Sequence, residues 1–205
     1  MARLQDDLDA SERHFADGDR LRLEIGFTRR RLWSLLGMVQ VAIARDQPEA
    51  ARAWAEEAIV LTTQPDGTAD VEAELHLAQA CLAGGELDEA RAALGRAEAA
   101  LQEVDVFSRA RLLRAQAGLA SASGDDQAAV ALLERSLAGL EATGHRLDQL
   151  HTLVELAPAL RRAGRAEEAD AAAGRALDQA TAMGAHAIVR HLARGRARRE
   201  QGGGG

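Results

Sequence analysis

The chain has 205 residues and a formal net charge of −7, and aromatic residues make up only 2% of it. This acidity argues against nucleic acid as a partner, because nucleic-acid binding needs clustered cations that displace counterions. The single cysteine excludes an intramolecular disulfide. No apolar run resembles a signal peptide or reaches the about 18 residues that span a bilayer. These features predict a cytoplasmic protein with no membrane partner.

Alanine carries much of the apolar content, and valine and isoleucine nowhere alternate with polar residues over the length of a strand. Because alanine and leucine are strong helix formers, we predict an all-α fold. Lysine and asparagine are absent, which we interpret as codon bias in a GC-rich bacterial genome of the actinobacterial type. Near the C-terminus we expect a solvated helix end or, alternatively, a phosphate or partner contact, formed by Arg190, Arg194, Arg196, Arg198 and Arg199.

Apolar periodicity and turn glycines divide the chain into ten predicted helices. Glycine ends helices readily because it adopts the left-handed conformation without strain. Acidic residues after the turns favour the N-terminus of the next helix. The predicted helices cover residues 8–25, 27–45, 48–63, 68–84, 87–104, 107–123, 126–143, 146–163, 166–183 and 186–199.

Similar sequence recurs at the start of alternate helices. Ser11, Ala51, Ala90, Ala129 and Ala169 are equivalent, at spacings of 40, 39, 39 and 40 residues. Each period contains two antiparallel helices, which cannot bury their apolar face alone and therefore stack on the next pair. We predict one solenoid over residues 1–201, followed by a glycine tail at 202–205. Its parts are a half repeat at 1–26, repeats at 27–66, 67–105, 106–144 and 145–184, and a terminal helix at 186–199.

Small residues at the expected helix crossings resemble those of the tetratricopeptide repeat (TPR) family. They are Ala78, Ala90 and Ala97 in the second full repeat, Ala117, Ala129 and Ser136 in the third, and Ala157, Ala169 and Ala176 in the fourth. The resemblance implies a right-handed α-solenoid of about ten antiparallel helices. The long period is similar to the variety found in bacterial regulators such as the maltose-operon activator and related large ATP-dependent regulators.

The first repeat leaves two questions open. Trp33-x-x-Leu36-Gly37 is similar to the opening of the family's first helix, but it lies two residues out of step with Ala51. Either the turn at 46–49 carries an insertion or this alignment is wrong. In addition, residues 1–26 match only the second half of a repeat. Either the chain is a piece of a longer protein, or its first helix self-associates through Phe15.

The resemblance also implies which residues line a concave, partner-binding groove. Arg111 and Arg114 lie three apart on one helical face, so that with Arg161 they are expected to bind a carboxylate or phosphate; the alternative is a solvated arginine face. This chemistry suggests an acidic peptide or other anionic ligand. The full set is Trp33, Leu36, Gln40, Glu72, Leu75, Gln79, Arg111, Arg114, His151, Val154 and Arg161.

Other reactive side chains are expected to be structural. We interpret Cys81 as a buried thiol, since a catalytic thiol needs exposure and a lowered pKa. His145, Asp148 and His151 share one helix face, but no third strong metal ligand accompanies them. The sequence contains no phosphate-binding loop or nucleophile motif. We therefore predict no catalytic residue, no metal and no cofactor.

The sequence predicts a non-catalytic scaffold that binds a partner protein or peptide in its groove. The alternative is a domain of a larger bacterial transcriptional regulator that senses a small-molecule effector. Both hypotheses follow from the resemblance, because a fold by itself does not determine function.

Overall fold

The computed structural model describes residues 8–24, 31–101, 105–185 and 188–190, which consist of helices and their connections without any strand. This confirms the all-α prediction. Most of the predicted terminal helix at 186–199, its arginines from Arg194 onward and the glycine tail at 202–205 lie outside the described residues. The helices are α1 (Leu8–Glu24), α2 (Leu32–Ala44), α3 (Pro48–Thr62), α4 (Val71–Ala83), α5 (Leu87–Ala100), α6 (Val106–Ala122), α7 (Asp126–Thr143), α8 (Arg146–Arg162) and α9 (Ala166–Ala182).

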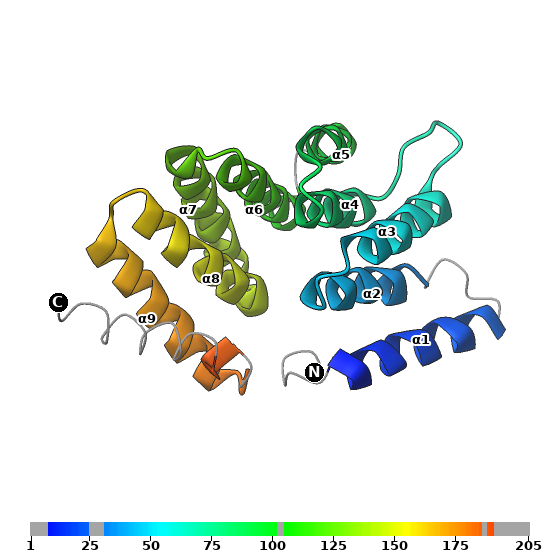
Figure 1. Cartoon of the computed structure of the whole chain (residues 1–205), viewed down its shortest axis with the longest axis horizontal. Helices are drawn as coiled ribbons and strands as arrows, with labels where there is room; N and C mark the ends of the chain where they lie inside the picture. The colour runs from blue at the N-terminus through cyan, green and yellow to red at the C-terminus, as the bar shows by residue number, and fades with distance from the viewer. Residues whose placement is uncertain (1–7, 25–30, 102–104, 186–187, 191–205) are drawn as a thin grey trace.

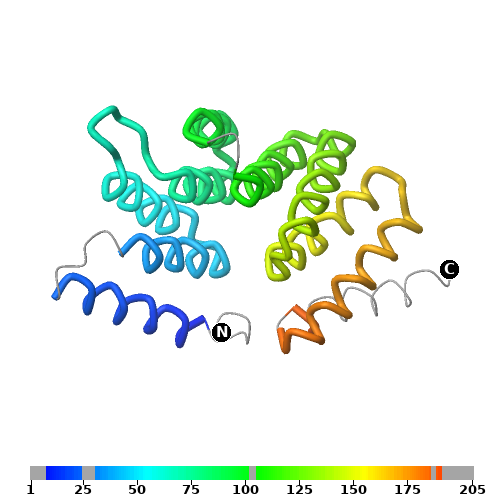
Figure 2. The backbone as a smooth tube through the Cα atoms, turned by 180° about the vertical axis from the view of Figure 1, so that it is seen from behind, coloured from blue at the N-terminus to red at the C-terminus, as the bar shows by residue number. Residues whose placement is uncertain are grey.

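The helices form an arch of antiparallel pairs (Figure 1). Each helix packs against the next one along the chain, and α2, α4, α6 and α8 also contact one another in succession. These four helices line the inner side of the arch, whereas α3, α5, α7 and α9 lie on its outer side. Seen from behind, the same arch has α1 and α9 at its two ends (Figure 2). The arrangement is that of a solenoid, as predicted.

Each inner helix is joined to its outer partner by a three-residue turn, and all four turns have the same conformation. The middle residue has a positive φ, with values of 58° at Asp46, 77° at Gly85, 81° at Gly124 and 80° at Gly164. The amide of the third residue donates to a carbonyl five residues earlier, as in Asp125 N to Ala120 O at 2.9 Å. The outer helices consequently begin 39, 39 and 40 residues apart, at Pro48, Leu87, Asp126 and Ala166.

Small residues lie where the paired helices cross. All nine small residues that the sequence placed at crossings are buried, and Ser136 Oγ donates to the carbonyl of Ala110 across the α6–α7 pair at 2.6 Å. Small side chains let two helix backbones approach closely, so neighbouring leucines fill the remaining space. Leu94 and Leu133, for example, are only 3% and 2% exposed.

The first repeat follows the same period as the others. Its turn has three residues like the later turns, so the suspected insertion at 46–49 is absent. The motif alignment was therefore wrong: Val39, which is fully buried, occupies the place of Ala78, 39 residues later. Gly37 instead faces α1, where an added Cβ would come within 2.3 Å of the Phe15 ring.

This contact also corrects the expectation for Phe15. Its ring packs on α2 of the same chain and is partly buried, so it does not provide an open apolar surface on α1. The large apolar side chains exposed on this helix are Leu21 and Leu23, at 56% and 50%.

Enlarging a buried alanine at a crossing should destabilise the protein. Ala90→Leu and Ala129→Leu each force a larger side chain into a fully buried site, at an expected cost of about 1–3 kcal/mol of unfolding free energy. Ala131→Leu is the control, because Ala131 is exposed on the same helix as Ala129. Urea denaturation measures all three; an equal effect of Ala131→Leu would contradict the crossing geometry.

The shared turn conformation leads to a second, independent prediction about stability. Asp46 holds the left-handed position that glycine occupies in the later turns, and a left-handed backbone costs a non-glycine residue about 1–2 kcal/mol. Asp46→Gly should therefore raise the thermal unfolding midpoint, and Gly124→Asp should lower it. If both substitutions left the midpoint unchanged, the shared turn conformation would be wrong.

Candidate functional site

One of the inner helices carries a large exposed aromatic side chain. Trp33, at the start of α2, is 61% exposed. Leu36 and Leu75, which the sequence also assigned to the groove, are 4% and 1% exposed and belong to the core; this assignment is corrected. Arg114 is buried at 8% exposure. The other predicted groove residues are partly buried: Gln40, Glu72, Gln79, Arg111, His151, Val154 and Arg161.

Equivalent side chains of consecutive inner helices contact each other directly. Gln40 Nε2 on α2 donates to Gln79 Oε1 on α4 at 2.6 Å. Arg111 Nη1 on α6 lies 2.5 Å from Glu72 Oε2 on α4. Both contacts join residues 39 positions apart, so the inner helices run side by side in the register of the repeat.

Polar contacts continue from α6 to α8. Arg111 Nε and Arg114 Nη1 lie 3.6 and 3.7 Å from the same oxygen, Asp148 Oδ1, and Arg114 Nε lies 3.5 Å from Glu155 Oε1. The result is an alternating row of five charges across three inner helices, which we call the inner-face ion network: Glu72, Arg111, Asp148, Arg114 and Glu155.

This network corrects the expected anion site. Arg111 and Arg114 are brought together as predicted, but three carboxylates of the chain itself already surround them. Arg161 does not join them in any described contact; its Nη2 lies 2.5 Å from Asp170 Oδ1 on α9. An additional carboxylate or phosphate would meet an excess of negative charge here, so the pair is not a free cationic site.

Aromatic packing fixes one end of the Arg111 side chain. The centroid of the Phe107 ring lies 5.7 Å from the Arg111 guanidinium carbon, within the range of a cation–π contact. The His145 ring stacks on the Phe107 ring at a centroid distance of 4.1 Å, and its Nδ1 contacts Thr143 Oγ1 at 2.9 Å. His145 therefore supports the network from the start of α8.

Several network atoms are buried without good hydrogen bonds. Glu72 Oε2, Arg111 Nε and Arg114 Nη1 are inaccessible to solvent and form no hydrogen bond within the described residues, although charged partners lie nearby. Burial raises the pKa of Glu72, and the positive charge of Arg111 partly offsets this shift. Unsatisfied buried polar groups are costly, so the attraction between neighbouring charges has to offset the hydrogen bonds that these atoms lack.

The remaining described residues include a buried thiol and no cluster of metal-binding side chains. Cys81 is 1% exposed, and burial raises its pKa to about 11, so its thiol stays protonated at neutral pH as expected for a structural residue. Among the described residues, no group of three or more histidine, cysteine or acidic side chains is arranged to hold a metal. None of the described helices is both long and apolar enough to cross a membrane.

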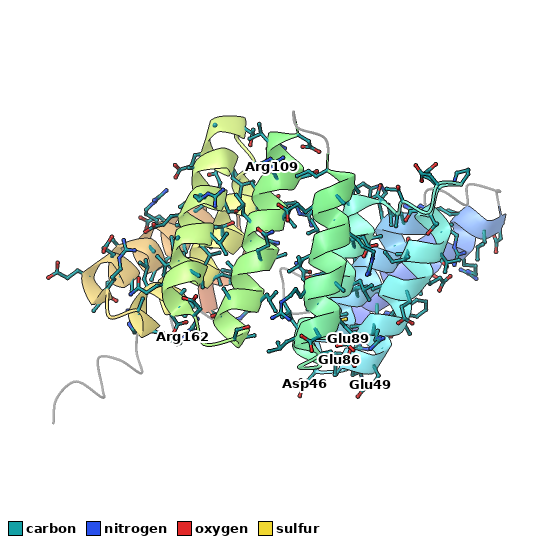
Figure 3. The ribbon with its side chains drawn as sticks, turned by 90° about the horizontal axis from the view of Figure 1, so that it is seen from above. Asp46, Glu49, Glu86, Glu89, Arg109 and Arg162 are labelled. Carbon is teal, nitrogen blue, oxygen red and sulfur yellow. The ribbon has the colours of Figure 1, made fainter. Side chains whose placement is uncertain are left out.

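A second feature lies at the C-terminal ends of the inner helices, where the turns that lead to the outer helices carry several acidic residues. Figure 3 shows Asp46, Glu49, Glu86 and Glu89 together at one end of the helices. A cleft of about 330 Å³ opens between α3 and the α4–α5 turn. Among the described residues that line it, Arg52 alone is basic, and it pairs with Glu56 at 2.8 Å and Glu86 at 2.5 Å. The lining residues are Pro48, Glu49, Arg52, Ala53, Glu56, Ala80, Gly84 and Glu86.

Comparison with protein-family models and with curated protein sequences gives no match. Solved structures do match. BtubC (BKLC) from P. vanneervenii has a TM-score of 0.59 at 16% identity over 89% of this chain and 90% of that chain. The MamA protein has a TM-score of 0.47 at 19% identity, covering 88% and 86%. A putative kinesin light chain from Podosopora anserina with nearly identical TPR-like repeats has a TM-score of 0.47 at 20% identity, covering 89% and 91%.

The chain shares the fold of BtubC, and its antiparallel helix pairs stack as a TPR-like solenoid. The TPR-like arrangement accounts for the inner face, because stacked pairs place equivalent residues of every first helix on one surface. Sequence reasoning assigned Asp148 only to a doubtful metal motif and missed Glu155 and Phe107. The signal for Asp148 and Glu155 was available: they lie three residues before and four after His151 on α8, a helix face already assigned to the groove.

Breaking the inner-face ion network should cost stability and do so most at neutral pH. Arg111→Gln leaves the Glu72 carboxylate buried without its nearest charge, at an expected cost of about 1–3 kcal/mol. The loss of Arg111 removes the influence that lowers the pKa of Glu72, so the folded-state pKa rises further above the unfolded value. Protonation on acidification then relieves the penalty, and the deficit should be smaller at about pH 5 than at about pH 7.5.

Urea denaturation of the variants at both pH values measures this effect. Glu72→Gln combined with Arg111→Gln should recover much of the stability, since no unpaired charge remains. Arg175→Gln is the matched control, because Arg175 pairs with Glu141 on the outer face and is 57% exposed. A deficit that did not depend on pH, or that the double variant shared in full, would contradict the pairing.

Proposed function

We propose that this protein is a non-catalytic scaffold that binds an extended segment of a partner protein along the inner face of its arch. The observation that carries the proposal is the row of equivalent positions Trp33, Glu72 and Arg111 on α2, α4 and α6. It combines an exposed aromatic ring with a pair of partly exposed charged side chains. TPR-like solenoids present such extended concave surfaces for binding.

The chemistry of the row supports a peptide ligand. Tryptophan is enriched at the energetic centres of protein interfaces because it buries a large area at low entropic cost. Trp33 contributes that area without being needed for the core, as its side chain is mostly exposed. The charged side chains of Glu72 and Arg111, which are 13% and 16% exposed, supply an acceptor and donors for the amides and carbonyls of a peptide backbone.

Selection from a displayed library of random linear peptides tests the proposal even though the partner is unidentified. Selection on the wild-type protein should yield peptides whose affinity falls by about tenfold or more for Trp33→Ala, the size of a typical hot-spot loss. Val60→Ala is the control, because Val60 is 78% exposed on the outer helix α3. If every selected peptide bound the two variants equally well, the inner face would not be the binding surface.

A further inference from the structure

Resting on the proposed function, we propose that the bound segment is basic and places a lysine or arginine side chain between the Trp33 ring and the Glu72 carboxylate. This assignment reverses the acidic ligand expected from the sequence. Three observations carry it: the register of α2 and α4, the order of charges in the inner-face ion network, and the exposed Trp33 ring.

The register places Trp33 beside Glu72. Gln40 and Gln79 are hydrogen-bonded at 2.6 Å, which fixes the position of α2 relative to α4 along the helix axes. Trp33 and Glu72 each lie seven residues before these glutamines, which is about two helical turns in both helices. They therefore take equivalent places on adjacent helices, at the level where Glu72 meets Arg111 on its other side.

The order of charges leaves a carboxylate at each end of the network. Arg111 lies between Glu72 and Asp148, and Arg114 lies between Asp148 and Glu155, so two guanidinium groups face three carboxylates. The terminal carboxylates each have one arginine neighbour in the network, whereas Asp148 has two. A cation next to Glu72 balances the charge, whereas an anion increases the imbalance.

Trp33 makes the Glu72 end the better of the two ends for a cation. The face of an indole ring attracts lysine and arginine more strongly than the other aromatic rings do. The Glu72 side chain is 13% exposed, so a ligand cation can approach its accessible part, while its buried Oε2 faces Arg111. A lysine or arginine side chain supplies the positive charge that balances the network.

The exposed Trp33 ring favours a side-chain cation over a small inorganic one. The alkyl stem of a lysine or arginine covers the apolar ring while its charged head lies beside the carboxylate, which a small hydrated ion cannot do. The ring and the carboxylate together therefore fit a basic peptide.

The composition of the selected peptides tests this inference. Those that lose affinity for Trp33→Ala should be enriched in lysine and arginine relative to the starting library. For the best such peptide, replacing its arginines with uncharged citrulline, or its lysines with norleucine, should weaken binding by about tenfold. Trp33→Leu should weaken binding to a similar extent, because it keeps the apolar area but removes the ring face.

A charge-matched control separates the site from the overall acidity of the protein. Glu72→Gln should weaken binding of the basic peptide by about tenfold. Glu86→Gln removes the same charge from the acidic cleft on the turn side and should change the affinity by less than about twofold. Measurements at physiological ionic strength suppress general attraction.

The outcomes distinguish the two proposals. Peptides that depend on Trp33 but are acidic or uncharged would overturn this inference and leave the scaffold function intact. Equal losses from Glu72→Gln and Glu86→Gln would likewise overturn it, because binding would follow net charge alone. The absence of any peptide that depends on Trp33 would overturn both. Urea denaturation of each variant confirms that it is folded.

Discussion

Contact between equivalent positions of consecutive inner helices is the interaction on which the rest of the structure depends. The Gln40–Gln79 hydrogen bond and the Glu72–Arg111 ion pair both join residues one 39-residue period apart. Such contacts form only if the paired helices cross closely, which the fully buried alanines Ala90 and Ala129 permit. The small residues thus set the spacing, and the spacing determines which polar side chains meet on the inner face.

The parts of the fold that could be predicted from the sequence are those with a local cause. Helix ends near Gly85, Gly124 and Gly164 were predicted because only glycine adopts their left-handed backbone without strain. The burial of Ala78 and Ala97 followed from their recurrence at crossings. The first repeat was harder, since Asp46 replaces the turn glycine and Val39 replaces the small residue.

The closeness of Arg111 and Arg114 was predictable, but their charged surroundings were not. Their spacing put both arginines on one helical face, but the sequence could not show that Asp148 and Glu155 on the next inner helix approach them. Those contacts depend on the angle between α6 and α8, which no local pattern encodes. The same limit applies to Leu36 and Leu75, whose burial depends on how closely neighbouring helices pack.

Hydroxyl-radical footprinting of the full chain, with and without a selected peptide, tests the central claim that the inner face is the binding surface. The method reports side-chain exposure, and Trp33 on the inner helix α2 can be compared with Val60 on the outer helix α3 and with Leu21 on α1, all three of which are exposed. Our account predicts that the bound peptide protects Trp33 and leaves Val60 and Leu21 as reactive as before. Protection of Val60 with unchanged oxidation of Trp33 would contradict it.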